Sequence, residues 1–303
     1  METGDKAYYA ELAASCYEPG WARRQPAMWP VPQPKFKPTV WRFSQARAAL
    51  SAAGGFVTTE QAERRNLILV NPIEGNYYAT SRNLVCAYQM VKPGEKARSH
   101  RHSAAALRLV MEAQPGAYTV VDGVRIDMAP GDVVLTPPFC WHGHGNESAA
   151  EAYWIDFLDV PLVQHLEAMF FAPHPDGYER IARQDPASPF RIPSAQALGA
   201  GVGPARVDVA PGVMPTIGLQ LIRQPAGGHS DEGRSTANAI YGVVSGRVRI
   251  VVEGALDKSL ACGDIIAVPC WYRHRWEAEQ DTVMLRVSDQ PLMALTGLLR
   301  QEA

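Results

Sequence analysis

The feature that most limits how this chain can fold is a spacing that occurs twice. Residues 131–142 begin with Gly-Asp, carry Pro six positions after the Gly and end with His, and residues 263–274 repeat these types at the same positions. Internal similarity of this kind indicates two copies of one structural unit. The 303 residues leave room for two domains of ordinary size.

Short apolar runs separated by Gly, Pro and Asp turns surround both copies and predict β-strands. In the first half we expect strands at 66–71, 84–91, 105–113, 117–121, 124–128, 133–136 and 151–158. In the second half we expect them at 217–223, 239–244, 247–252, 265–268 and 282–288. Many short strands with such turns predict an all-β fold of antiparallel barrels.

The remaining segments suggest the domain organisation. We expect an N-terminal helix and proline-rich arm over 1–60, a first barrel over 61–171, a connection with little regular structure over 172–215 and a second barrel over 216–303. Helical spacing of apolar residues predicts helices at 5–17, 44–53, 161–171 and 291–301. Trp21, Trp29 and Phe36 are expected to anchor the arm by burial.

Composition excludes several classes of protein. Hydrophobic residues make up 47% and charged residues 20%, which is enough for a packed core, and the net charge of -2 provides no basic field for nucleic acid. No apolar run reaches the roughly 18 residues of a membrane span. Five scattered cysteines without a Cys-x-x-Cys pair are typical of free thiols, so we expect a cytoplasmic protein.

Three histidines are candidate metal ligands. His100 and His102 alternate on a predicted strand, so both rings lie on one face, and His142 arrives from another strand. A facial set of three imidazoles leaves coordination positions open, as catalytic metal sites do. A lone His-x-His pair is more often an ordinary polar pair on an exposed strand. The Gly turn before this pair and the Gly-Asp, Pro and His spacing after it favour the metal site.

The second half lacks this ligand set. Its counterpart of His100 and His102 falls at Gly233 and Ser235 in the sequence, so we expect one metal ion per chain, in the first barrel. His229 and His274 are then interpreted as packing residues or remnants.

These motifs resemble the paired motifs of the cupin superfamily. The segments 100–108, 130–132 and 141–146 (Trp-His-Gly-His-Gly-Asn) are most similar to gentisate/salicylate 1,2-dioxygenases. The resemblance implies a bicupin of two jelly-roll barrels and an Fe(II) enzyme that uses O2 as co-substrate. It also implies a small aromatic acid of the salicylate type as substrate, opened between its carboxyl-bearing and hydroxyl-bearing carbons, and a homo-oligomer, commonly a tetramer.

The metal's charge favours a chelating substrate. The carboxylate that cupins usually carry after the His pair is absent, because residues 103–107 read Ser-Ala-Ala-Ala-Leu. Three neutral imidazoles leave about two positive charges on a divalent ion, which a dianionic salicylate would neutralise. Iron is preferred because the reaction needs a redox-active metal, although zinc or copper would bind these nitrogens as well. Its identity therefore comes from the resemblance.

Further residues are candidates for the substrate site. Arg108 shares the strand parity of the His pair and can bind a carboxylate; a salt bridge at the barrel rim is the alternative. The resemblance implies substrate contacts from Gln89 and from one of Arg64 and Arg65, with Arg64 preferred. It also implies that His144 hydrogen-bonds the substrate hydroxyl or handles its proton. Asp156 interrupts an apolar strand and is expected to orient His144 or an arginine.

The wall of this site departs from the family pattern. Four residues before Gln89 the family commonly has an aromatic residue, and two before it a glycine; this chain has Val85 and Ala87. The change points to gentisate, salicylate or a 5-substituted salicylate such as 5-nitrosalicylate or a halogenated one. Alternatively, Val85 and Ala87 only compensate for other changes.

Two other functions remain open at this point. One is a cupin isomerase or hydrolytic enzyme that uses Mn or Zn, and the other is a non-catalytic binding bicupin. A requirement for O2 separates the first from a dioxygenase, and the intact His set with Arg108 speaks against the second.

Overall fold

The computed structural model describes residues 3–22 and 27–302. The chain divides into a short N-terminal unit, residues 1–33, and a large unit, residues 34–303. Helix α1 (Thr3–Ala14) and a 3-10 turn η1 (Gly20–Ala22) form the first unit. Trp21 is 75% exposed and Trp29 56%, so the predicted burial of these two residues is wrong for the single chain, whereas Phe36 is buried.

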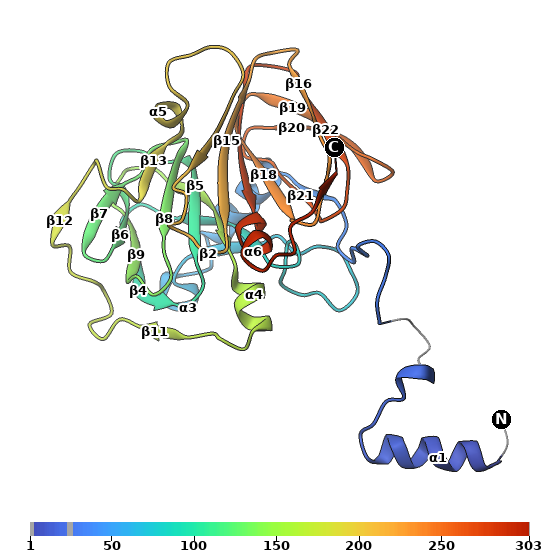
Figure 1. Ribbon diagram of the computed structural model, residues 1–303. Coiled ribbons are helices and arrows are strands. Elements are labelled where there is room, and N and C mark those ends of the chain that lie inside the picture. Colours follow the sequence, from blue (N-terminus) through green and yellow to red (C-terminus); the bar gives the residue numbers. More distant parts are fainter. Residues whose placement is uncertain (1–2, 23–26, 303) are drawn as a thin grey trace. The chain divides into compact units, whose positions relative to one another are not determined.

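Two β-barrels make up the large unit, the first mostly in cyan to yellow and the second mostly in orange to red in Figure 1, apart from the early strand β1. One sheet of the first barrel has the order β13-β8-β5-β10-β3-β2. Its strands are β2 (Arg65–Ile68), β3 (Val85–Val91), β5 (Ala106–Glu112), β8 (Asp132–Thr136), β10 (Ala152–Leu158) and β13 (Arg191–Pro193). The other sheet has the order β11-β4-β9-β6-β7-β12. Its strands are β4 (Lys96–His102), β6 (Ala117–Val121), β7 (Val124–Asp127), β9 (His142–Asn146), β11 (Phe171–Pro173) and β12 (Arg183–Gln184).

The second barrel repeats this arrangement. Its first sheet has the order β1-β21-β18-β23-β15-β14, and its second the order β16-β22-β19-β20. The first sheet comprises β1 (Thr39–Trp41), β14 (Ala205–Val209), β15 (Gly218–Gln224), β18 (Ala239–Ser245), β21 (Ile265–Val268) and β23 (Thr282–Ser288). The second comprises β16 (His229–Glu232), β19 (Arg247–Val252), β20 (Leu256–Ala261) and β22 (His274–Ala278), and a separate pair joins β17 (Arg234–Ser235) to β24 (Gln301–Glu302). The predicted all-β fold of two barrels is confirmed.

The segment 172–215 is more regular than its prolines suggest. It contributes β12 and β13 to the first barrel and β14 to the second, and it includes the short helix α5 (Ser194–Leu198). These strands lie at sheet edges, where a proline can be accommodated because one side of the strand forms no ladder hydrogen bonds.

The other helices of the large unit are short. They are α2 (Phe43–Ala53), α3 (Thr59–Ala62), α4 (Val160–His165) and α6 (Gln290–Leu295). The helices predicted at 161–171 and 291–301 stop early, because Glu167 and Gly297 adopt positive φ values of 57° and 71° that end a right-handed helix. None of the helices in the described ranges is long and apolar enough to cross a membrane.

Successive side chains on a strand point alternately into the barrel interior and into an apolar core that the two barrels share. On β5, Leu107 and Leu109 belong to a cluster that also contains Ile240 and Leu285 of the second barrel. Val110 of β5 belongs instead to a cluster inside the first barrel. Side chains on opposite faces of a strand alternate, so each of these two sheets presents one face to its own barrel and the other to the neighbouring sheet. The barrels are thus joined by a common apolar layer.

The repeated Gly-Asp motif has a conformational cause. Gly131 and Gly263 have φ values of 84° and 83°, a region that side chains with a Cβ rarely adopt. The following aspartates, Asp132 and Asp264, are buried, and each accepts a hydrogen bond from the backbone N–H three residues before it. The motif therefore closes the same tight turn at the same place in both barrels.

Candidate metal centre

Strands β4 and β9 bring the three predicted histidines together. The two strands pair antiparallel with His100 opposite His142, and His102 lies two residues further on the same face. One ring nitrogen from each residue lies within 4.8 Å of the others. The ring centroids of His100 and His102 are 4.4 Å and 4.8 Å from that of His142. Within the described residues the set contains three histidines and no carboxylate.

Backbone contacts orient two of the rings. Nδ1 of His102 lies 2.8 Å from the carbonyl oxygen of Ala104, and Nδ1 of His142 lies 3.0 Å from that of Cys140. A carbonyl only accepts hydrogen bonds, so Nδ1 of each ring carries the hydrogen and Nε2 keeps its lone pair. Fixing one nitrogen in this way leaves the other free to bind a metal ion.

His100 has a different environment. Its Nδ1 is buried without a hydrogen-bond partner, and the Glu63 carboxylate oxygen Oε2 lies 3.8 Å away. Glu63 ends helix α3 with a φ of 50° and also lies 3.4 Å from the Arg64 guanidinium. Sequence reasoning missed Glu63. Its place beside Arg64 was the available signal, since a carboxylate adjacent to a predicted site arginine is a natural ion-pair partner.

The rings are uncharged near neutral pH. Burial lowers the pKa of His100 to about 3, and the Arg64 charge adds to the effect. Burial also lowers the pKa of His102, and lowers that of His142 well below its usual range. Neutral imidazoles are the form that coordinates metals, so the donor set suits a divalent ion without prior loss of protons.

Arg108 lies inside the first barrel, with 2% of its surface exposed. Its Nη1 donates to Thr119 Oγ1 at 2.7 Å, and its Nε lies 3.5 Å from Asp156 Oδ1, a contact too poorly aligned to satisfy either atom. Burial lowers the pKa of Arg108 to about 10, so it remains a cation near neutral pH. The rim position considered from the sequence is excluded. Asp156 was expected to orient His144 or an arginine, and Arg108 is the residue opposite Asp156 on β5.

His144 contacts Arg108 directly. Nη1 of Arg108 lies 2.6 Å from Nδ1 of His144. Because a guanidinium only donates, Nδ1 must accept, and burial beside Arg108 holds the pKa of His144 well below its usual range. The neutral ring then carries its hydrogen on Nε2. Nη2 of Arg108 also lies 3.3 Å from Nε2, but a neutral ring accepts at one nitrogen only, so the shorter contact at Nδ1 is the hydrogen bond and Nε2 is a donor.

The two adjacent arginines differ in their contacts. Arg64 Nε donates to Gln89 Oε1 at 2.5 Å, while Arg65 donates to Glu95 and to the carbonyl of Val57. Arg64 is the one beside the histidines, and Arg65 fastens β2 to the turn before β4.

Val85 and Ala87 line up with Gln89 on β3. They pair with Leu158 and Asp156, respectively, and are 1% and 5% exposed. Alternation places Val85, Ala87 and Gln89 on one face of the strand, the face of Asp156. The departures from the family pattern therefore border the interior that holds Arg108.

The second barrel places different residues at the ligand positions. Glu232 lies opposite His274, as His100 lies opposite His142. The counterpart of His100 is therefore Glu232, and the expectation of Gly233 was wrong by one residue. Counting by twos along the strand, the counterpart of His102 is Arg234 rather than Ser235. A guanidinium cannot act as a metal ligand, since it has no lone pair to donate.

Comparisons with known proteins agree with this arrangement. The model of the cupin domain matches residues 87–158. The 5-aminosalicylate 1,2-dioxygenase of Comamonas sp is 30% identical, over 100% of this chain and 91% of that protein. Gentisate 1,2 dioxygenase 1 of Aquipseudomonas alcaligenes is 30% identical, over 98% of this chain and 95% of its own length.

A solved structure extends the likeness to the whole fold. The salicylate 1,2-dioxygenase from Pseudaminobacter salicylatoxidans superposes with a TM-score of 0.88 at 26% identity, covering 98% of this chain and 96% of that one. Neither an isomerase nor a non-catalytic bicupin is favoured by these relatives. The chain belongs to the family of gentisate and salicylate 1,2-dioxygenases, ring-cleaving oxidoreductases built from two cupin barrels.

Proposed function

We propose that this protein uses Fe(II), one ion per chain in the first barrel, and O2 to open a salicylate-type aromatic acid between its carboxyl-bearing and hydroxyl-bearing carbons. The convergence of three neutral imidazoles carries the proposal. His100, His102 and His142 would hold the ion. When bound, a redox-active ion supplies electron transfer between the ring and oxygen, which zinc cannot do. Both oxygen atoms enter the product, so one O2 is consumed per ring opened.

Arg108 would bind the substrate carboxylate. Its Nη1 is engaged by Thr119 and His144, and its Nη2, 3.3 Å from the donor Nε2 of His144, has hydrogens to donate to the substrate. Inside the barrel such a charge-assisted bond is stronger than at the surface. Asp156 beside Nε limits the side chain to this orientation. Arg64 and Gln89, which are hydrogen-bonded to each other, would border the same substrate.

His144 would hold the substrate's phenolic oxygen. Its Nε2–H is a donor, because Nδ1 accepts from Arg108. A donor at this atom stabilises the phenolate form that chelates a metal ion, and the Arg108 charge resists protonation of the ring. His144 would therefore position a deprotonated substrate oxygen rather than remove its proton.

Oxygen uptake tests the proposal. Iron(II)-loaded protein is supplied under air with gentisate, salicylate, 5-aminosalicylate and 5-nitrosalicylate in turn. We expect one O2 consumed per acid molecule for at least one of them, and none from the His102→Ala variant. The matched control is His229→Ala, since His229 is exposed in the second barrel. Turnover at the same rate without O2 would favour the Mn or Zn isomerase or hydrolase instead.

The wall residues should set the ring substituent. Ala87→Gly and Val85→Trp restore the glycine and an aromatic ring of the family pattern. We expect the ratio of kcat/KM for 5-substituted salicylates to that for gentisate to change by roughly tenfold, the size that small changes of pocket shape produce. An unchanged ratio in both variants would mean that Val85 and Ala87 only compensate for other changes.

We also propose a homo-oligomer, a tetramer by family likeness. Light scattering on the purified protein measures the mass directly. A mass of one chain would contradict the proposal.

For the cellular location we propose the cytoplasm. All five cysteines are free thiols, as expected in a reducing compartment. Fractionation of the source cells would test this, and recovery of the protein outside the cytoplasmic fraction would contradict it.

A further inference from the structure

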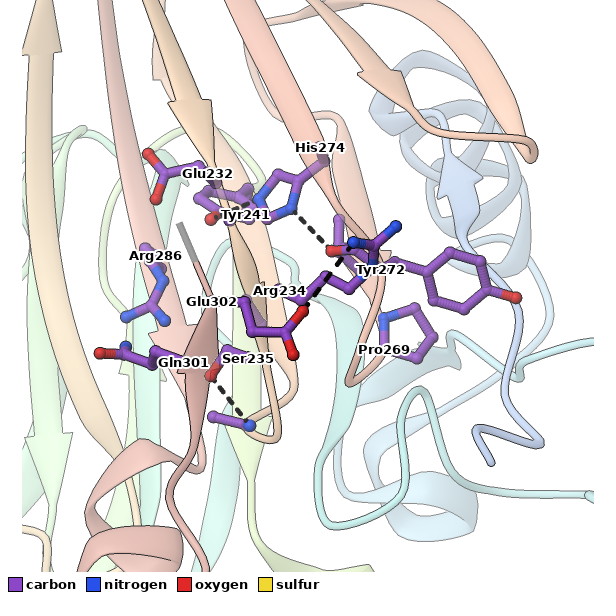
Figure 2. Close-up of a pocket in the computed structure, with 14 residues that line it drawn as sticks. Glu232, Arg234, Ser235, Tyr241, Pro269, Tyr272, His274, Arg286, Gln301 and Glu302 are labelled. Carbon is purple, nitrogen blue, oxygen red and sulfur yellow. Dashed lines mark hydrogen bonds and ion pairs between the residues drawn. The ribbon is translucent and has the colours of Figure 1, made fainter. Parts of the chain in front are cut away.

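The second barrel contains a cavity of about 440 Å³ that plays no part in the proposed reaction. Figure 2 shows Glu232, Tyr241 and His274 gathered at one end of it and Gln301 at the other, with Arg286 at the side. Strand β24 pairs with β17, with Gln301 opposite Ser235, and both strands contribute residues to the cavity lining. A volume of this size is typical of small-molecule sites.

The two barrels carry different charges at equivalent interior positions. In the first barrel Arg108, the third residue of β5, lies opposite Asp156, the fifth of β10. In the second barrel the corresponding pair is Tyr241 on β18 and Arg286 on β23. The second interior therefore has an arginine where the first has a carboxylate, and a neutral phenol where the first has an arginine.

Arg286 has no acidic partner in the part of the chain that the structure describes. Its guanidinium donates to Ser288 Oγ and Gln290 Oε1, both at 3.2 Å, and no carboxylate among residues 3–22 and 27–302 lies within 4.0 Å of it. A half-buried cation that contacts only neutral acceptors retains a favourable site for an anion.

The other charges that line the cavity are already compensated. Glu232 pairs with Arg206 and accepts a hydrogen bond from Ser230 Oγ at 2.8 Å. Arg234 lies 3.0 Å from Glu253 and 4.0 Å from Glu302. Burial lowers the pKa of His274 to about 4, so its ring adds no charge near neutral pH. Among the charged residues that line the cavity, Arg286 is therefore the one that remains for an anionic ligand to pair with.

The neutral groups favour an organic acid over an inorganic anion. Tyr241 Oη lies 2.9 Å from His274 Nε2, while Nδ1 of that ring faces the Tyr272 carbonyl. With the hydrogen on Nδ1, Tyr241 donates to Nε2 and its oxygen keeps a lone pair for a ligand hydroxyl. Beside the polar Ser235 and Gln301, the lining includes an apolar and aromatic wall: Ala237, Ala239, Val268, Pro269 and Tyr272. A flat apolar body next to one anionic group fits this lining.

We propose that the second barrel binds a small aromatic carboxylic acid, whose carboxylate pairs with Arg286 and whose ring lies against the apolar wall. This site is separate from the histidine set and does not depend on a metal ion or on ring cleavage. The chain would then hold two acids of one chemical class, one in each barrel.

Equilibrium dialysis of radiolabelled salicylate against the iron(II)-loaded protein, without O2 so that nothing turns over, tests the proposal. We expect two equivalents per chain for the unaltered protein and one for Arg286→Gln, with the second-barrel affinity weakened at least about tenfold. Arg249→Gln is the matched control, because Arg249 is an exposed arginine of the same barrel that pairs with Asp257, and it should bind two. One equivalent for the unaltered protein, or two for Arg286→Gln at unchanged affinity, would overturn the proposal.

A second measurement needs no variant. Crystals of the full chain grown with 5-bromosalicylate give an anomalous bromine signal, which we expect in the second barrel near Arg286. A bromine signal confined to the first barrel would overturn the proposal. Oxygen uptake by the unaltered protein is an independent readout, so failure of the second-barrel site and failure of the dioxygenase function are distinguishable.

Discussion

The two barrels of this chain share a fold and differ in what they place inside it. At the ligand positions the first has His100 and His102, whereas the second has Glu232 and Arg234. The histidine at the end of the repeat is present in both, as His142 and His274, yet one joins two other imidazoles and the other hydrogen-bonds Tyr241. The difference teaches that the repeated motif fixes the turn and the strand, while the residues opposite it decide whether a metal can bind.

The sharpest way to break this comparison is to remove one histidine from each barrel. His102→Ala should lose both the metal ion and oxygen uptake, because two imidazoles hold a divalent ion poorly. His274→Ala should keep one equivalent of iron per chain, since its ring does not reach the first-barrel set. Elemental analysis of the purified variants measures the metal content. An equal loss of iron in both variants would contradict the assignment.

The shared apolar layer can be tested by a change in its middle. Leu109→Ala leaves a cavity among fully buried side chains of both barrels and should lower the free energy of unfolding by about 3 kcal/mol. Leu67→Ala, at a residue that is 38% exposed, should change it by less than about 0.5 kcal/mol. Calorimetry should show one transition at a lower temperature. Two separate transitions, with only the first barrel affected, would mean that the barrels unfold independently.

The interior charges of the two barrels can be compared through Arg108. Arg108→Gln keeps hydrogen-bonding atoms but removes the charge that we propose binds the substrate carboxylate, so kcat/KM should fall at least about 30-fold, or about 2 kcal/mol. The effect should fall mainly on KM, and the iron content should stay at one equivalent. Steady-state oxygen uptake measures both constants. A fall in kcat at unchanged KM would contradict a role in binding the carboxylate.

The smallest expected effect concerns Glu63, the carboxylate beside His100 in the first barrel. In the second barrel the carboxylate beside His274 is Glu232. Glu63→Gln removes the carboxylate 3.8 Å from His100 Nδ1 and should weaken iron binding by about tenfold, the low end of what outer partners of ligating histidines contribute. Competition with a chelator measures this affinity. Glu60→Gln, at an exposed residue of the same short helix, should leave it unchanged.

Local pattern was enough to predict much of this molecule. Strand alternation correctly placed Arg108 in the interior, and turn residues marked most strands to within a residue or two. The two overlong helices show the limit of that method: apolar spacing continued past Glu167 and Gly297, but the positive φ values at these residues end the helices, and only the fold determines them.

Contacts between distant segments were harder to predict. Gly233 lies eight residues before Tyr241, as His100 lies eight before Arg108, but the residue opposite His274 is Glu232, nine residues before Tyr241. Counting back from His274 by the distance between His142 and His100 leads to Glu232. Thr119 gave no pattern, because its contact with Arg108 depends on two strands that the fold brings together.

Anomalous diffraction at the iron edge, on crystals of the iron(II)-loaded chain, tests the central claim most directly. The account predicts one peak per chain, within coordination distance of His100, His102 and His142. A peak beside Glu232 and His274, or equal peaks in both barrels, would contradict it.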